Sequence, residues 1–283
     1  MSSGRNAVSR EERRGDSTLA PGADPSSSLA SDLLFDERST VDWVETFLTV
    51  PNEYGQIVTF IPTEQQRRMD ADHTGRDDTV KARQTRATSW IQARNVRRMT
   101  TGFGLNCIVA MQTDSMTQLA RARIKHHLAD LARNNMAYEI TVDNKNELVL
   151  GKMENRWVFT SGEAKSGGVR GIHSAHIVHA SEVAHWEQDP GLVLGGVIPA
   201  IPPPPYGWFD IESTPNGATG FFYEHVMDAL NGESISSVHF YPWFIEPTYT
   251  IESYRSARGI DVDGLLASFK PTREEERLIS RII

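Results

Sequence analysis

Residues 80–90, VKARQTRATSW, place a lysine, arginines and hydroxyl groups where a strand passes through a short polar loop into a helix. Backbone N–H groups at such a helix N-terminus can bind phosphate groups. In the usual pattern, G-x-x-x-x-G-K-[ST], Arg86 would take the place of the second glycine and Ala87 that of the lysine. Thr88 stands where a magnesium-binding hydroxyl belongs, and Ser89 follows it. From these residues alone, an ordinary basic turn is the plainer interpretation.

A second candidate segment is AHIVHASEVAHW at 175–186, in which an apolar strand ends in Ser181 and Glu182. A carboxylate at a strand end can polarise the water that attacks a phosphate, which is a general-base role for Glu182. The usual pair is Asp-Glu, so Ser181 would hold a magnesium-bound water with less charge. The alternative is that Glu182 only caps the next helix.

The third segment is FDIESTPNG at 209–217, where a strand leads into Ser213, Thr214 and a turn that contains Gly217. Two adjacent hydroxyls at a strand end could sense a bound phosphate. Taken alone, the run S-T-P-N-G is ordinary turn chemistry.

The elements that must position these segments alternate between strand-like and helix-like patterns. Asp114 is a candidate cap for the second helix. A short strand is expected to end at 80–82, further strands are expected at 106–111, 147–150, 156–160, 176–180, 207–211 and 237–241, and helices at 88–99 and 114–132. The pair 147–150 and 156–160 has the pattern of a β-hairpin. This alternation predicts an α/β fold with a mostly parallel sheet, whose site lies at the carboxyl ends of the strands.

Composition limits the classes of protein that fit. The 283 residues carry a formal net charge of −8 and contain a single cysteine, Cys107. A disulfide framework or a cysteine-based zinc site is therefore excluded, and Cys107 is expected to be an inert core thiol. No apolar run approaches the roughly 20 residues of a membrane helix, and no signal peptide is evident. The acidic balance also lacks the basic footprint of a simple nucleic-acid-binding domain.

The histidines at 173, 176 and 179 suggest a metal site, but strand geometry argues against it. On a strand, His173 and His179 share one face while His176 points to the other. The first 32 residues are rich in Ser, Gly, Pro and mixed charge and are expected to form a disordered tail.

The three segments, in this order, resemble the ATPase part of the large terminase subunit of tailed phages. KARQxxxTS is similar to the Walker A segment of a branch in which the phosphate-binding lysine stands at the start of the loop. Lys81 matches this displaced lysine, and Arg83 and Gln84 match the Arg-Gln pair that follows. Arg86 departs from the glycine usual in the family, which bears on ATP binding. A side chain there could crowd the phosphates, or its guanidinium could reach them.

The resemblance covers roughly residues 40–283 and extends to the other two segments. Ser181-Glu182 followed by V-A-x-W is similar to the Walker B segment of the same branch. The segment with Ser213 and Thr214 is similar to the coupling motif, which passes the state of the γ-phosphate to the DNA-gripping surface.

What the resemblance implies is an ASCE-type, RecA-like P-loop NTPase that uses ATP and Mg²⁺. Lys81 would bind the β- and γ-phosphates, Thr88 would coordinate Mg²⁺ and Glu182 would orient the water. The loop residues expected to contact the nucleotide are Gln84, Arg86, Ala87, Thr88 and Ser89.

Three further residues take roles from the resemblance. Arg83 would act in cis as a sensor or stabiliser of the transition state. Arg170, in a glycine-flanked loop, resembles the arginine finger that completes a neighbour's site in a ring. Gln66, or alternatively Gln65, resembles the glutamine that pairs with the adenine edge. A plain loop arginine and a polar helix face are the competing interpretations.

The implied function is the motor of phage DNA packaging during virion assembly. It would translocate double-stranded DNA into a procapsid in the host cytoplasm, with the portal protein and the small terminase subunit as partners. A homo-oligomeric ring is expected when assembled, and a monomer is compatible with the isolated chain. A motor that grips DNA transiently through loops need not be basic overall, so the charge of −8 does not exclude it.

The expected organisation is a tail at 1–32, one ATPase domain at 33–270 with a helical beginning at 33–75, and the start of a hinge at 271–283. No room remains for the nuclease half of a large terminase, so no DNA cleavage is expected from this chain. Two alternatives stay open. One is a catalytically degenerate P-loop domain that binds DNA or a partner, and the other is a helicase-type ATPase.

Overall fold

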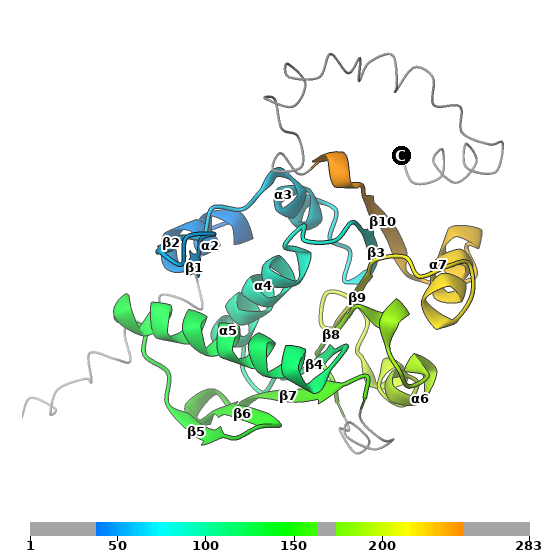
Figure 1. Ribbon diagram of the computed structural model, residues 1–283. Helices are drawn as coiled ribbons and strands as arrows, with labels where there is room; N and C mark the ends of the chain where they lie inside the picture. Colours follow the sequence, from blue (N-terminus) through cyan, green and yellow to red (C-terminus); the bar gives the residue numbers. More distant parts are fainter. Residues whose placement is uncertain (1–37, 164–173, 246–283) are drawn as a thin grey trace, which may run out of the picture.

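The centre of the molecule is a twisted eight-stranded sheet, seen in the computed structural model of Figure 1, which describes residues 38–163 and 174–245. Its strands are β3 (Arg76–Lys81), β4 (Asn106–Met111), β5 (Ile140–Asp143), β6 (Glu147–Leu150), β7 (Asn155–Ser161), β8 (Ile177–Ser181), β9 (Trp208–Ser213) and β10 (Ser237–Tyr241). A separate small hairpin consists of β1 (Thr49–Pro51) and β2 (Ile57–Thr59).

The strand order is β10-β3-β9-β8-β4-β7-β6-β5. All neighbours from β10 to β7 are parallel, whereas β6 is antiparallel to β7 and β5 to β6. The predicted mostly parallel sheet is confirmed, as is the antiparallel pairing of the two segments expected to form a hairpin. Strand β9 lies between β3 and β8, although it follows both in the sequence, and this insertion determines which side chains meet at the site.

Helices cover both faces of the sheet and give two apolar cores. They are α2 (Thr40–Phe47), α3 (Glu64–Ala71), α4 (Ala87–Thr101), α5 (Asp114–Arg133), α6 (Pro190–Leu194) and α7 (Phe221–Asn231), with short 3-10 turns at η1 (Gly151–Met153), η2 (Val183–His185), η3 (Ile198–Ala200) and η4 (Trp243–Ile245). The first core joins α2, α4 and α5 to the sheet, and the second joins α6 and α7 to its other face.

Successive side chains of a strand point to opposite faces of the sheet, so neighbouring residues of one strand belong to different cores. In β4, Cys107 and Val109 belong to the core under α4 and α5, whereas Ile108 and Ala110 belong to the other. Cys107 is fully buried, and this burial raises the pKa of its thiol well above the ordinary range. It is therefore held as a neutral thiol in the core.

The sheet face beneath α4 changes from apolar to polar towards β3. On β8, β9 and β3 this face carries buried ionisable or hydroxyl side chains instead of aliphatic ones: Asp77, Thr79, Lys81, His179, Ser181, Asp210 and Glu212. Buried charges require partners, so this strip is where chemistry or specific ion pairing is expected.

Local capping explains several helix boundaries. Thr63 and Gln66 form a reciprocal capping box at the start of α3. At α5 the predicted cap, Asp114, is wrong, because Thr113 accepts the N–H of Met116 and is the N-cap. Asp114 instead accepts a hydrogen bond from the Ser161 hydroxyl.

The segment 33–75, expected to be helical, contains α2 and α3 but also the β1–β2 hairpin within its described part. The tail predicted at 1–32 and the hinge predicted at 271–283 lie outside the described residues. Among residues 38–163 and 174–245, none of the helices has the length and apolar character needed to cross a bilayer.

Candidate active site

The loop between β3 and α4 passes the carboxyl edge of the sheet in a tight, unusual conformation. Gln84 and Arg86 have left-handed backbones, with φ of 57° and 59°. This region of φ is uncommon for residues other than glycine, so the fold compels the conformation. Arg86 is the N-cap of α4 and provides no side-chain cap, so the helix N-terminus is not closed by that side chain. Arg83, Gln84 and Arg86 are exposed, whereas Ala87 is buried and Thr88 and Ser89 are half-buried.

Lys81 is the last residue of β3, and its ammonium lies between two carboxylates. Its Nζ is 2.6 Å from Oε1 of Glu182 and 3.0 Å from Oε2 of Glu212. Burial alone lowers the pKa of Lys81, but Glu212 and Glu182 outweigh it and raise the pKa above its ordinary value. The lysine is therefore a fixed positive charge at the strand end.

Glu212 on β9 is the residue of this site that the sequence reasoning missed. Its side chain has 0% exposure, and its Oε1 accepts hydrogen bonds from Thr88 Oγ1 at 2.6 Å and Ser181 Oγ at 2.5 Å. Burial alone raises the pKa of Glu212, yet Lys81, His179 and Ser181 more than reverse this, so the pKa lies well below its usual range. Glu212 is thus a buried, ionised carboxylate.

A signal for Glu212 was present in the sequence. In FDIES, an acidic residue recurs at alternate positions of an apolar strand, which places Asp210 and Glu212 on one face. Two carboxylates on one face of a buried strand need cationic partners, and this requirement marks both as unusual.

Glu182 follows β8 and has a left-handed backbone, with φ of 56°. It makes no side-chain capping hydrogen bond to the η2 turn that follows, so a purely capping role does not describe it. Its Oε2 instead accepts hydrogen bonds from the backbone N–H of Thr214 at 3.1 Å and from Thr214 Oγ1 at 3.2 Å. The carboxylate is therefore oriented by Lys81 on one side and by Thr214 on the other.

Ser213 and Thr214 connect the end of β9 to the turn after β8. Ser213 Oγ accepts the N–H of Ala184 at 3.1 Å, and its distance to Glu182 Oε2 is 3.5 Å. Thr214 Oγ1 lies 2.8 Å from Nε2 of His185. The predicted coupling residues are thus in direct contact with the predicted general base.

The two candidate adenine-reading glutamines are both buried, and Gln66 lies beside the loop. Its Nε2 donates to the carbonyl of Arg86 at 2.9 Å, and its Oε1 accepts from the N–H of Thr63 at 2.9 Å. Gln66 therefore supports the left-handed backbone of Arg86. The side-chain amide of Gln65 is buried without a hydrogen-bond partner in the described structure.

Not every predicted site residue can be placed. Arg170 and His173 fall in 164–173, outside the described residues. His179 is fully buried, with Nε2 3.5 Å from Oε1 of Glu212, whereas His176 accepts the N–H of Asn106 elsewhere.

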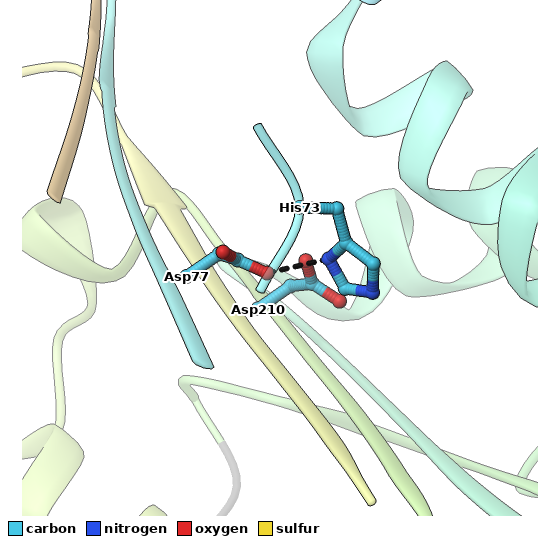
Figure 2. A group of neighbouring side chains, drawn as sticks. All are labelled: His73, Asp77 and Asp210. Atoms are coloured by element: carbon cyan, nitrogen blue, oxygen red, sulfur yellow. Dashed lines mark hydrogen bonds and ion pairs between the residues drawn. The ribbon is translucent and has the colours of Figure 1, made fainter. Parts of the chain in front are cut away.

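A second group of ionisable residues lies on the same sheet face near the start of β3 (Figure 2). His73 Nδ1 is 2.5 Å from Oδ2 of Asp77, and His239 Nε2 is 2.8 Å from Oδ1 of the same carboxylate. Asp210 pairs with Arg94 of α4 at 2.5 Å. Ligand atoms of His73, Asp77 and Asp210 lie within 4.8 Å of one another. Because cationic or imidazole groups already contact both carboxylates, we assign them a structural role.

The strand order and the site together define a class of protein. A loop-bearing strand, β3, is followed by α4, and an extra strand, β9, separates β3 from β8. Polar residues converge at the carboxyl edge of these three strands. This is the ASCE, RecA-like form of the P-loop NTPase fold.

Comparison with solved structures finds a similar fold in phage large terminases. The ATPase domain of the Thermus phage P74-26 large terminase superposes with a TM-score of 0.54 at 17% identity, over 71% of this chain and 90% of that one. The large terminase of bacteriophage HK97 gives a TM-score of 0.55 at 12% identity, over 71% of this chain and 43% of that one. The sequence matches no protein-family model and no curated protein. The chain thus has the fold of these domains and spans under half the length of the HK97 protein.

Proposed function

We propose that this chain is an ATP-hydrolysing motor of phage DNA packaging. The observation that carries the proposal is the convergence of Lys81, Thr88 and Glu182 at the carboxyl edge of the sheet, next to the N-terminus of α4. These residues come from three segments far apart in the sequence. The likeness in fold to phage terminase ATPase domains supports the same function.

Lys81 and the backbone amides of the loop bind the β- and γ-phosphates in this proposal. The loop residues Gln84, Arg86, Ala87 and Ser89 surround the start of α4, where a helix N-terminus favours anions. Phosphate oxygens compete with Glu182 and Glu212 for the Lys81 ammonium. Nucleotide binding therefore frees Glu182 from its ion pair.

Glu182 acts as the general base that orients the attacking water. Thr214 already fixes the direction of its carboxylate through two hydrogen bonds, which lowers the cost of positioning. Phosphoryl transfer depends mainly on positioning and charge neutralisation. Mg²⁺ supplies part of that neutralisation when bound, and the residues present suit it, since Thr88 and Ser181 offer hydroxyl oxygens beside a carboxylate.

Arg83 is the cis-acting cation of the proposal, and Arg170 reaches the site of a neighbouring copy in a homo-oligomeric ring. Ser213 and Thr214 transmit a change at Glu182 to the segment that leads into α7. The partners are double-stranded DNA, the portal protein and the small terminase subunit, and the site of action is the host cytoplasm.

The variant Glu182→Gln tests the reaction. Turnover should fall by about 10²- to 10⁴-fold, because a general base is removed, while ATP binding is retained. ATPase rates with and without DNA and a nucleotide-binding titration measure the two effects. Glu187→Gln is the matched control, since Glu187 is an exposed glutamate five residues further along. Its activity should equal that of the unmodified chain.

Three results would count against the proposal or a part of it. Unchanged turnover in Glu182→Gln would remove the general-base role. Failure of the unmodified chain to bind ATP at millimolar concentration would favour a degenerate P-loop domain that binds DNA or a partner. Strand separation of duplex DNA driven by ATP would favour a helicase-type enzyme.

A further inference from the structure

The position expected to supply the first carboxylate at the end of β8 holds a serine. Ser181 is buried and carries no charge. Its neighbour in the sheet is Glu212, because Ser181 and Glu212 are register partners in the parallel β8–β9 pair. Register partners project to the same face, so the carboxylate of Glu212 lies over the hydroxyl of Ser181.

Apart from the contact of Oε2 with Lys81, the contacts of Glu212 converge on its other oxygen. Oε1 accepts from the hydroxyl of Thr88 at 2.6 Å and from that of Ser181 at 2.5 Å, while Nε2 of His179 is 3.5 Å away. Thr88 and Ser181 are also 3.4 Å apart, oxygen to oxygen. Three oxygen atoms from α4, β8 and β9 thus surround one point beside the start of the helix. Hard divalent cations prefer such oxygen ligands.

Charge balance favours a cation at the same point. One ammonium, that of Lys81, faces the two carboxylates of Glu182 and Glu212. When phosphate oxygens engage Lys81, Glu212 loses much of its compensation while its side chain remains fully buried. An ionised carboxylate in that position is costly unless another cation approaches.

We propose that Glu212 supplies the anionic ligand of the Mg²⁺ that accompanies the nucleotide, through Oε1. Glu212 thereby takes over, from the neighbouring strand, the charge that Ser181 lacks. Thr88 is the hydroxyl ligand, and Ser181 orients the carboxylate by donating a hydrogen bond to it. This inference rests on the proposed nucleotide-binding function and adds a residue to it.

The experiment compares Glu212→Gln with the double variant Glu212→Gln/Ser181→Asp. Each is titrated with a fluorescent ADP analogue without metal, then with ADP and Mn²⁺ while free Mn²⁺ is followed by electron paramagnetic resonance. Glu212→Gln should bind metal-free ADP at least as tightly as the unmodified chain, because a competitor for Lys81 is removed, but should lose about 10- to 100-fold in Mn²⁺ affinity. The double variant, which returns a carboxylate to β8, should recover most of that loss.

Glu212→Asp keeps the charge but retracts the oxygens by one methylene, and it serves if the glutamine variant does not fold. It should bind ADP alone normally and Mn²⁺ more weakly than the unmodified chain. Unchanged Mn²⁺ affinity in the glutamine or aspartate variant would overturn the assignment of Glu212 and leave the proposed function standing. No binding of ADP to the unmodified chain, with or without Mn²⁺, would overturn both.

Discussion

Two clusters of buried charge lie on the same face of β3 and β9, beneath the same helix, and they are built differently. Near the start of β3, the carboxylates of Asp77 and Asp210 are matched by His73, His239 and Arg94. At the end of the same strand, a single ammonium faces two carboxylates. In the first cluster each carboxylate has its own imidazole or guanidinium partners, whereas in the second the carboxylates of Glu182 and Glu212 share one ammonium.

The backbone conformation also differs between the two clusters. Three of the five described non-glycine residues with positive φ, namely Gln84, Arg86 and Glu182, lie around the second cluster. Strained backbone and unmatched charge both cost stability, so they persist where they serve a ligand. We therefore assign the first cluster to the stability of the fold and the second to the proposed reaction.

The largest effect is expected from Lys81→Met. It leaves the buried carboxylate of Glu212 and the partly buried one of Glu182 without their common cation, so the free energy of unfolding should fall by about 3–5 kcal/mol and nucleotide binding should be lost. Urea denaturation and a nucleotide titration measure both. Adding Glu212→Gln should recover much of the stability but none of the binding. Equal stability of the single and double variants would contradict the charge-imbalance argument.

Asp210→Asn tests the matched cluster. Arg94 and Asp210 are both nearly inaccessible, with side-chain exposures of 3% and 4%. The free energy of unfolding should fall by roughly 3 kcal/mol, at the lower end for a broken buried pair, because asparagine still accepts a hydrogen bond from Arg94. The ATPase rate per folded molecule should not change. A specific loss of turnover would mean that this cluster also takes part in the reaction.

A smaller effect is expected from Asp77→Asn, in the way the free energy of unfolding depends on pH. Burial alone raises the pKa of Asp77, but hydrogen bonds from His239 and His73 hold it well below its ordinary value of 3.8. A depressed pKa gives stability that is present above 3.8 and lost as the pH falls towards the folded-state pKa. The Asp77→Asn variant should therefore have a lower free energy of unfolding than the unmodified chain at neutral pH. It should lose less of that free energy between about pH 5 and pH 3. If the free energies of unfolding of the variant and of the unmodified chain fell in parallel as the pH is lowered, this account would be refuted.

The smallest effect is expected at Arg86. Glycine adopts left-handed backbone without the penalty of roughly 1 kcal/mol that a side chain carries, so Arg86→Gly should stabilise the fold by up to about that amount. Glu154→Gly is the matched control, because Glu154 has a φ of 55° and lies outside the site. Its free energy of unfolding should rise by a similar amount. ATP affinity should be retained, since Lys81 and the loop amides carry the binding. A marked loss of affinity would show that the guanidinium contacts phosphate.

The sequence was sufficient to predict most of the helices and strands. It was not sufficient to predict which strands lie next to one another in the sheet. The strand and helix patterns around Lys81, Glu182 and Ser213 predicted the α/β class and brought these residues to the same edge of the sheet, where the candidate site lies. Glu212 was missed because its importance depends on β9 lying between β3 and β8, a non-local arrangement that periodicity does not encode. Likewise, the support that Gln66 gives to Arg86 joins residues twenty positions apart and appears only in three dimensions.

The position of Lys81 within a strand has a consequence for nucleotide exchange. Lys81 pairs in register with Tyr241 of β10, and the next N–H, that of Ala82, donates to the carbonyl of Tyr241 at 3.2 Å. Its backbone is therefore held by the sheet and has few degrees of freedom. A lysine at the start of a helix would move with the loop, but here residues 83–86 can rearrange while the charge stays in place. In the proposed function, entry and departure of a nucleotide then require ordering only of the loop, which reduces the conformational entropy lost in each cycle.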